Sequence, residues 1–342
     1  MQEATLYERL AEGKVRCQLC AHRCVIAPGK RGICGVRENR EGTLYSLVYG
    51  QVIAQAVDPI EKKPLFHFYP GSTAFSIATV GCNFRCVFCQ NAEISQMPRD
   101  LGRIEGYPVP PQAIVEAARR HRSRSIAYTY TEPTVFFEYT YDISLLAHEA
   151  GIANVYVTNG YMTAEMLDRF TSPDAPPLLD AANVDLKAFR DAFYRHQCGA
   201  TLQPVLDSLI LMKRRRVWVE VTTLVIPELN DGEAELRDIA RFIAQELGVD
   251  TPWHVSRFHP TYRLLDKPLT PVATLHRARE IGLEEGLRYV YEGNVPGGGG
   301  EDTLCPTCKQ VVIRRRGFTV VHNAAVGGIC AHCGGAVDGV GL

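Results

Sequence analysis

The sequence has no run of about 18 apolar residues that could cross a membrane. Its first residues, Met1 to Ala4, lack the basic and apolar regions of a secretory signal. The 37 Lys and Arg residues nearly balance the 38 Asp and Glu residues. The resulting net charge of −1 provides no general attraction to nucleic acid or to a membrane surface. We therefore expect a cytoplasmic protein that binds no membrane, and nucleic acid is disfavoured as a partner.

Cysteine, by contrast, is plentiful. Eleven of the twelve cysteines fall into three tight groups, and Cys198 stands alone. Without a secretory signal, clustered thiols indicate metal binding rather than disulfides. A chain of 342 residues has room for one large α/β domain with small appendages. We expect a metal-binding segment and hairpin at 1–57, an α/β domain at 58–296, and a linker with a second metal-binding segment at 297–342.

The middle group, Cys82, Cys86 and Cys89, has C-x3-C-x2-C spacing and follows a strand-like run and the turn residue Gly81. Three thiolates can hold three irons of a [4Fe–4S] cluster, in which each iron normally takes one thiolate. The next cysteine is Cys198, so one iron would stay open, as in catalytic metal sites. A zinc knuckle or a set of structural cysteines is the alternative, which the missing fourth ligand disfavours.

The amino-terminal group consists of Cys17, Cys20, Cys24 and Cys34, which suffice for a closed tetrahedral site. Zinc is the simpler prediction, and an auxiliary iron–sulfur cluster is the alternative. Residues 44–57 alternate apolar and polar side chains around Gly50 and predict a small hairpin. Residues 58–64 contain two prolines and alternating charges, which predict a linker or rigid loop. Lys62 and Lys63 are then either solvated or on the substrate side.

The carboxyl-terminal group follows a glycine-rich linker at 297–300 and consists of Cys305, Cys308, Cys330 and Cys333. Two C-x2-C pairs joined by strand-like runs are typical of a zinc ribbon. Zinc is the expected metal, and iron in a rubredoxin-like site is the alternative. Arg314, Arg315 and Arg316 are expected at a solvated hairpin tip.

Between residues 74 and 291, strand-like and helix-like runs alternate. Such alternation predicts a parallel sheet with right-handed crossovers. Six or seven units are too few for a closed eightfold barrel, so we expect an α/β fold built on a partial (β/α)6 TIM-like barrel. The strands are predicted at 74–80, 125–130, 153–158, 183–186, 217–225, 253–258 and 288–291. Helices are predicted at 111–120, 135–150, 202–213 and 233–247, with Gly151 and Gly248 as stop signals.

Polar residues follow several of these strands, where parallel α/β sheets place their sites. Each has an ordinary explanation, such as a turn, a surface salt bridge or a packed histidine. Their shared location predicts one site around the cysteine loop. They are Tyr130, Thr131 and Glu132 after the second strand, Thr158 and Asn159 after the third, Asp185 and Lys187 at the fourth, and His254 and His259 at the sixth.

Residues 81–91, Gly-Cys-Asn-Phe-Arg-Cys-Val-Phe-Cys-Gln-Asn, resemble the cluster loop of the activating-enzyme branch of the radical S-adenosylmethionine (SAM) superfamily, typified by pyruvate formate-lyase activating enzyme. The whole chain is similar to the radical SAM proteins of the AmmeMemoRadiSam gene neighbourhood. That similarity rests on the two outer cysteine groups and on residues 58–64, 130–133 and 252–260.

The resemblance implies a [4Fe–4S] cluster on Cys82, Cys86 and Cys89, whose open iron binds the amino and carboxylate groups of SAM. Many superfamily members hold the SAM amino group with a Gly-Gly-Glu-Pro segment. Here residues 130–133 keep Glu and Pro but replace the glycines by Tyr130 and Thr131. The resemblance further implies SAM contacts for Thr158 and Asn159, a partner for the SAM carboxylate in Lys187 beside Asp185, and contacts to SAM or substrate for His254 and His259.

The implied reaction is reductive cleavage of SAM to a 5′-deoxyadenosyl radical, which abstracts hydrogen from a substrate. That substrate is either a glycyl or other peptide site, as for activating enzymes, or a small-molecule metabolite. An electron donor such as flavodoxin or ferredoxin is implied as a partner. A hypothesis of another class is a metal-stabilised binding module. Formation of 5′-deoxyadenosine distinguishes the enzyme from the module.

Overall fold

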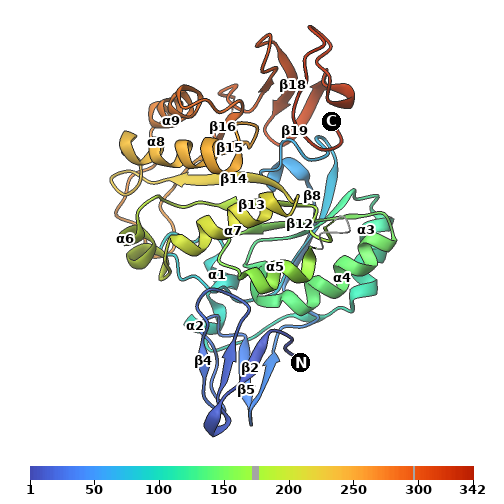
Figure 1. Cartoon of the computed structure of the whole chain (residues 1–342), viewed down its shortest axis with the longest axis vertical. Coiled ribbons are helices and arrows are strands. Elements are labelled where there is room, and N and C mark those ends of the chain that lie inside the picture. The colour runs from blue at the N-terminus through green and yellow to red at the C-terminus, as the bar shows by residue number, and fades with distance from the viewer. Residues whose placement is uncertain (172–176, 296) are drawn as a thin grey trace.

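The computed structural model describes residues 1–171, 177–295 and 297–342. The amino-terminal segment lies at one end of the long axis and the carboxyl-terminal segment at the other (Figure 1). Between them lies one eight-stranded sheet with the strand order β16-β15-β14-β13-β12-β11-β9-β8. Seven strands run parallel, and β8 pairs antiparallel with β9. The strands are β8 (Ala54–Pro59), β9 (Thr73–Ala78), β11 (Ser125–Tyr128), β12 (Ala153–Thr158), β13 (Ala181–Asp185), β14 (Trp218–Val225), β15 (Trp253–Arg257) and β16 (Val290–Gly293).

The sheet forms the predicted partial barrel. Each of the seven predicted strands is present within two residues of its predicted ends. Strands β8 and β16 are the two ends of the strand order, so the barrel stays open between them. The parallel strands number seven, one more than in a (β/α)6 barrel, because β16 extends the sheet beyond β15. All four residues of β11 are buried, as expected for a parallel strand covered on both faces.

The crossover helices also lie close to their predicted positions. Leu236, Ile239, Ala240 and Ile243 are almost fully buried, which confirms the predicted apolar face of that helix. Gly151 and Gly248 follow helix ends with positive φ, as stop signals should. The longer helices are α3 (Pro111–Arg120), α4 (Phe137–Glu149), α5 (Ala164–Phe170), α7 (Gln203–Arg214), α8 (Glu233–Phe242), which continues as the π-helix η5 (Ile243–Leu247), and α9 (Val272–Glu284). No described helix is both long enough and apolar enough to cross a bilayer.

The amino-terminal segment consists of short antiparallel strands, and the predicted hairpin at 44–57 is wrong. Its two halves pair with different partners: β6 with β5 and β1, and β8 with β9. Gly50 does turn the chain, but the strands on either side complete separate sheets. The short strands are β1 (Gln2–Glu3), β2 (Tyr7–Arg9), β3 (Val15–Cys17), β4 (Val25–Ile26), β5 (Arg37–Arg40), β6 (Thr43–Ser46) and β7 (Gln51–Val52), the last paired with β10 (Tyr107–Pro108).

Residues 58–64 are part of the barrel rather than a linker. Asp58 lies in β8 of the main sheet, so the predicted boundary at 57/58 falls within a strand. The chain continues as the short helix η2 (Ile60–Lys62). Asp58, Glu61 and Lys63 are buried, because each charged side chain has a charged partner nearby. The predicted boundary at residue 296 lies outside the described residues.

The carboxyl-terminal ribbon is a three-stranded sheet of β17 (Thr303–Leu304), β18 (Val311–Arg316) and β19 (Thr319–Asn323). The expectation that all three arginines are solvated is wrong for Arg315. Its guanidinium is buried at the barrel, where it donates to the Phe66 carbonyl at 2.7 Å and to Thr303 Oγ1 at 2.8 Å. Arg314 and Arg316 are exposed, because alternate residues of a strand point to opposite faces.

Candidate active site

A cavity of about 540 Å³ lies at the carboxyl ends of the parallel strands. Its wall brings together ten of the twelve residues that the sequence predicts for cofactor binding. They are Cys82, Cys86, Cys89, Tyr130, Thr131, Glu132, Thr158, Asn159, Asp185 and Lys187. Segments more than one hundred residues apart thus contribute to one site, as the rule for parallel sheets predicts.

The cysteine loop is held in place from both sides. Gly81 has φ 105°, and a Cβ there would lie 2.7 Å from Val36 of the amino-terminal segment, so glycine is required. The backbone N–H groups of Arg85 and Val87 donate to carbonyls of the π-helix η4 (Tyr194–Cys198) at 2.9 and 3.0 Å. These three thiols would hold three irons of a [4Fe–4S] cluster and leave its fourth iron without a thiolate.

Cys198, which the sequence leaves unassigned, lies against this loop. A hydrogen bond with Cys198 lowers the pKa of the Cys86 thiol, whereas burial raises the pKa of Cys82 and of Cys89. The hydroxyl of Ser95 lies 3.2 Å from Cys89 Sγ. The pKa of Cys86 is therefore shifted in the opposite direction to the pKa of Cys82 and of Cys89.

Tyr130 has a backbone conformation that favours glycine. Its φ is 63°, in the left-handed region that a side chain adopts at a cost of about 1–2 kcal/mol. Two contacts hold it there: its hydroxyl donates to the Asp58 carboxylate, and Lys63 Nζ lies 4.6 Å from the centre of its ring. Thr131 Oγ1 donates to the Thr79 carbonyl at 2.7 Å.

Glu132 organises the ends of two neighbouring strands. Its carboxylate accepts from the N–H of Thr134 at 3.0 Å, from Thr158 Oγ1 at 2.7 Å and from the N–H of Asn159 at 2.8 Å. The side chain is buried, and burial raises the pKa of its carboxyl group above the ordinary value. Asn159 in turn donates to Asn83 Oδ1 at 2.7 Å, inside the cysteine loop. Glu132 therefore links the ends of β11 and β12 to the cysteine loop.

Lys187 is a mostly buried cation on the wall of the cavity. Its Nζ lies 2.8 Å from Asp185 Oδ2. Burial by itself would lower the pKa of Lys187, but the Asp185 carboxylate and the nearby thiols raise it well above the ordinary value. Lys187 thus stays charged and can pair with an anionic group in the cavity.

Lys62, Lys63 and Pro64 also line the cavity, as the substrate-side alternative for the two lysines predicts. The Asp58 carboxylate accepts from Lys62 at 2.9 Å, Lys63 at 2.6 Å and Ser76 at 2.9 Å. These bonds hold the pKa of Asp58 below its usual range, although burial opposes them. Burial lowers the pKa of Lys63 to about 8. Phe318, from the ribbon, also lines the cavity.

His254 and His259 do not line the cavity. Alternate residues of a strand share a face, so His254 and Ser256 of β15 point to the same side of the sheet. Ser256 lines the cavity, whereas His254 lies one layer deeper, farther from the carboxyl end of the strand. The His254 ring is buried, and its Nε2 lies 2.7 Å from Glu220 Oε2. His259 is exposed beyond the end of β15. Neither histidine is therefore placed to touch a molecule in the cavity.

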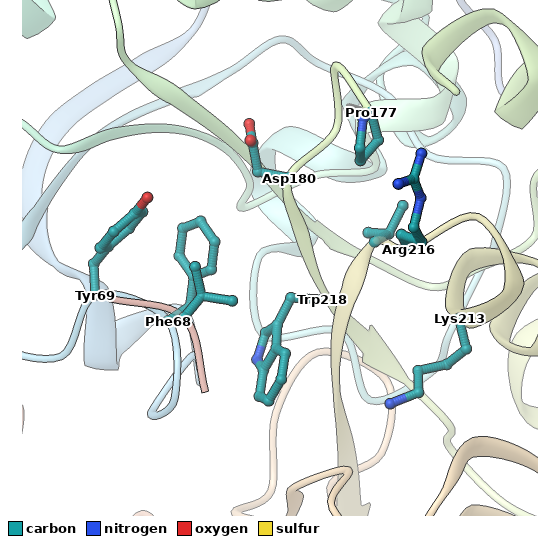
Figure 2. Close-up of a pocket in the computed structure, with 9 residues that line it drawn as sticks. Phe68, Tyr69, Pro177, Asp180, Lys213, Arg216 and Trp218 are labelled. Carbon is teal, nitrogen blue, oxygen red and sulfur yellow. The ribbon is translucent and has the colours of Figure 1, made fainter. Parts of the chain in front are cut away.

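A second cavity, of about 350 Å³, lies at the amino ends of β13 and β14 (Figure 2). Asp180 and Trp218 come from those strand ends, and Phe68 and Tyr69 from the segment before β9. Asp180 already accepts from His148 and from the N–H of Asn154. This cavity is at the end of the sheet opposite the cysteines, and no described residue lines both cavities.

The two outer cysteine groups differ in geometry. The four carboxyl-terminal sulfurs converge within 4.8 Å of one another, with Cys305–Cys333 at 3.7 Å and Cys308–Cys330 at 3.8 Å. A tetrahedral metal with bonds of about 2.3 Å separates its sulfurs by about 3.8 Å. The ribbon is thus a preformed four-thiolate metal site. The four amino-terminal cysteines line one small cavity with Leu19, Ile26 and Val135.

Comparison with known proteins agrees with this site. The model of the radical SAM superfamily matches residues 76–243. The chain is 48% identical to Uncharacterized protein MJ0808 of Methanocaldococcus jannaschii over 340 residues, 99% of each chain. It is 24% identical, over 62% of this chain and 78% of the relative, to a protein of the same organism named as a glycyl-radical enzyme activating enzyme, MJ1632.

Among solved structures, SuiB of Streptococcus suis bound to S-adenosylmethionine aligns with a TM-score of 0.51 at 12% identity, over 69% of this chain and 53% of that chain. This level of identity supports the fold alone. The cysteine loop after the first parallel strand, the cavity beyond it and the matched residues lead to one conclusion: the chain belongs to the radical SAM superfamily.

Proposed function

We propose that this protein is an enzyme that reductively cleaves SAM and abstracts hydrogen from a substrate bound in the same cavity. One observation carries the proposal: the three cysteines of the open cluster motif share a cavity wall with Glu132, Asn159 and Lys187. When bound, the reduced [4Fe–4S] cluster and SAM supply a 5′-deoxyadenosyl radical. The chain's own residues then determine position and access.

The residues of the cavity have distinct roles in this proposal. Lys187 would pair with the SAM carboxylate, because it is charged, mostly buried and beside the cysteine loop. The backbone at Tyr130 and Thr131 would hold the SAM amino group. Thr158 and Asn159, fixed by Glu132, would contact the ribose or methionyl part. Phe84 and Phe88, both buried, keep water from the cysteine loop.

Two substrate classes remain within the proposal. The named relative MJ1632 supports a glycyl or other peptide site, as for activating enzymes. A small-molecule metabolite is the alternative, and it would share the cavity of about 540 Å³ with SAM. The narrower similarity to the AmmeMemoRadiSam proteins belongs to this proposal as well. The proposal also includes a cytoplasmic location, a flavodoxin or ferredoxin as electron donor, and zinc in the ribbon.

The test is formation of 5′-deoxyadenosine by anaerobically reconstituted protein with dithionite and SAM. We expect product from the wild type and none from Cys86→Ala, with Cys308→Ala as a control that leaves the cysteine loop intact. A reduced cluster that yields no product would refute the enzyme hypothesis in favour of the binding module. Deuterium transfer from labelled peptides or metabolites into 5′-deoxyadenosine then identifies the substrate class.

A further inference from the structure

We propose that the outer face of the cysteine loop is the docking surface of an acidic electron-transfer protein. This role rests on the proposed function, in which a reduced cluster cleaves SAM. Phe84, Cys86 and Phe88 line the cavity, whereas Arg85, between them, is exposed and does not line it. The loop therefore has one face toward the cavity and another toward solvent, and a protein can reach the second face.

Four arginines surround this outer face. Three segments hydrogen-bond to residues 84–87 of the loop, and each carries one arginine. The helix η4, whose carbonyls accept from the loop at 2.9 and 3.0 Å, carries Arg195. Arg263 donates its N–H to a carbonyl of the loop at 2.9 Å, and Arg99 donates through Nη1 to another at 3.5 Å. The fourth is Arg85, in the loop itself.

The carboxylates on the same segments, residues 96–100, 191–198 and 262–264, do not cancel this charge. Asp191 lies 2.5 Å from Arg195, and Asp100 lies 3.0 Å from Arg263. Four guanidinium groups against two carboxylates leave two positive charges in excess. In the described part of the chain, the other two arginines form no ion pair with a carboxylate.

The arginines are presented to solvent in a defined arrangement. The side chains of Arg195 and Arg263 are 63% and 60% exposed. Arg85 lies across Gly199, which ends η4 with φ 68°. A Cβ at Gly199 would lie 2.2 Å from Arg85 Nε, so the glycine leaves the space that this side chain occupies. Arg99 is fixed by a further bond from Nη2 to the Ile33 carbonyl at 3.1 Å.

The position of this surface selects the kind of partner. Arg85 directly precedes the predicted cluster ligand Cys86, so a protein seated on Arg85 lies a short distance from the iron. A partner of opposite charge is steered to such a surface and oriented on it. An acidic one-electron carrier, such as a flavodoxin, meets both requirements. A nucleic acid would be attracted as well, but it would supply no electron.

The experiment mixes reconstituted full-length protein with reduced flavodoxin and follows the loss of the cluster's visible absorbance in stopped flow. We expect the wild-type rate to fall steeply as salt is added. R195Q/R263Q should be roughly 10-fold slower than the wild type at low salt, and R85Q should also be slower. The control R119Q/R120Q removes two exposed arginines from the last turn of α3, before the amino end of β11, and should match the wild type. Dithionite, which needs no docking surface, should reduce all four proteins equally fast.

Three results would overturn the inference. They are equal flavodoxin rates in R195Q/R263Q and R119Q/R120Q, a wild-type rate that does not depend on salt, and a wild-type cluster that dithionite reduces but flavodoxin does not. The last result would assign the surface to a partner of another kind. Failure of the proposed function is a separate result, because protein that forms no 5′-deoxyadenosine with dithionite still gives measurable rates of cluster reduction.

Discussion

The guanidinium carbon of Arg315 lies 4.2 Å from the centre of the Phe66 ring, which joins the ribbon to the base of the barrel. The same side chain lies 3.7 Å from the buried carboxylate of Glu61. Phe66 also packs against His254 and Tyr291, each at 4.8 Å between ring centres. Since residues 62–64 line the cavity, the ribbon supports one wall of the active site.

Replacing Arg315 should therefore be costly. Arg315→Met leaves the Glu61 carboxylate buried without its cation, which we expect to lower the free energy of unfolding by about 3–5 kcal/mol. Arg316→Met changes an exposed arginine on the same strand and should alter stability by no more than about 0.5 kcal/mol. Chemical denaturation of both variants is the measurement. Equal stability of the two would show that the buried pair does not hold the ribbon.

The backbone of Tyr130 predicts an unusual order of stability. Tyr130→Ala loses the hydroxyl bond to Asp58 and keeps the left-handed conformation. Tyr130→Gly loses the same bond but relieves the strain, so it should be more stable than Tyr130→Ala by about 1 kcal/mol. Urea unfolding of the two variants checks this. A less stable glycine variant would contradict the strained conformation.

Glu132→Gln should disturb the strand ends around the cavity. An amide NH2 would face donors that now point at a carboxylate, at a cost of about 1–3 kcal/mol. We expect a lower melting temperature together with weaker SAM binding, because Asn159 loses its anchor. The exposed Glu93→Gln, near the cysteine loop, is the matched control. Wild-type SAM affinity in Glu132→Gln would exclude a positioning role for this carboxylate.

Lys187→Met removes the cation proposed to face the SAM carboxylate. A charge-assisted hydrogen bond contributes about 1.5–3 kcal/mol, so SAM affinity should fall roughly 10- to 100-fold. Titration calorimetry on reconstituted protein measures it. Lys213→Met, a partly buried lysine paired with Asp250 at the second cavity, should bind SAM normally. If both variants bind SAM equally well, Lys187 has no contact with it.

His67 predicts a loss of stability in acid. Its Nδ1 lies 2.6 Å from the Asp338 carbonyl, and burial lowers the pKa of His67 to about 4, below the ordinary 6.5. Between these values the unfolded chain binds a proton that the native chain does not, so stability falls as pH drops. The expected loss is roughly 3 kcal/mol from pH 6.5 to pH 4.

The measurement for His67 compares unfolding of the wild type and His67→Gln from pH 7 to pH 5, where other acid-sensitive groups act on both proteins. The wild type should lose more stability than the variant over this range. Parallel curves would show that His67 does not titrate as its burial implies.

Much of the fold follows from local pattern. Strand periodicity, glycine stop signals and the spacing of Cys82, Cys86 and Cys89 depend on neighbouring residues, so they are legible in the sequence. The rule that sites lie at strand ends then brings ten of the twelve predicted residues to one cavity. The same rule fails for His254. His254 and Ser256 point to the same side of the sheet, and packing places Ser256 at the cavity and His254 beneath it, against Glu220.

The sequence by itself thus determined the barrel, the open cluster motif and the superfamily. The tertiary structure decided which charges are buried, that residues 62–64 line the cavity, and that the four ribbon sulfurs converge. Arg315 is expected to be solvated from the sequence, and Lys63 either solvated or on the substrate side. Contacts with other segments make the burial of both possible. Burial of a charge depends on the partner that the fold brings to it, and no local pattern encodes that partner.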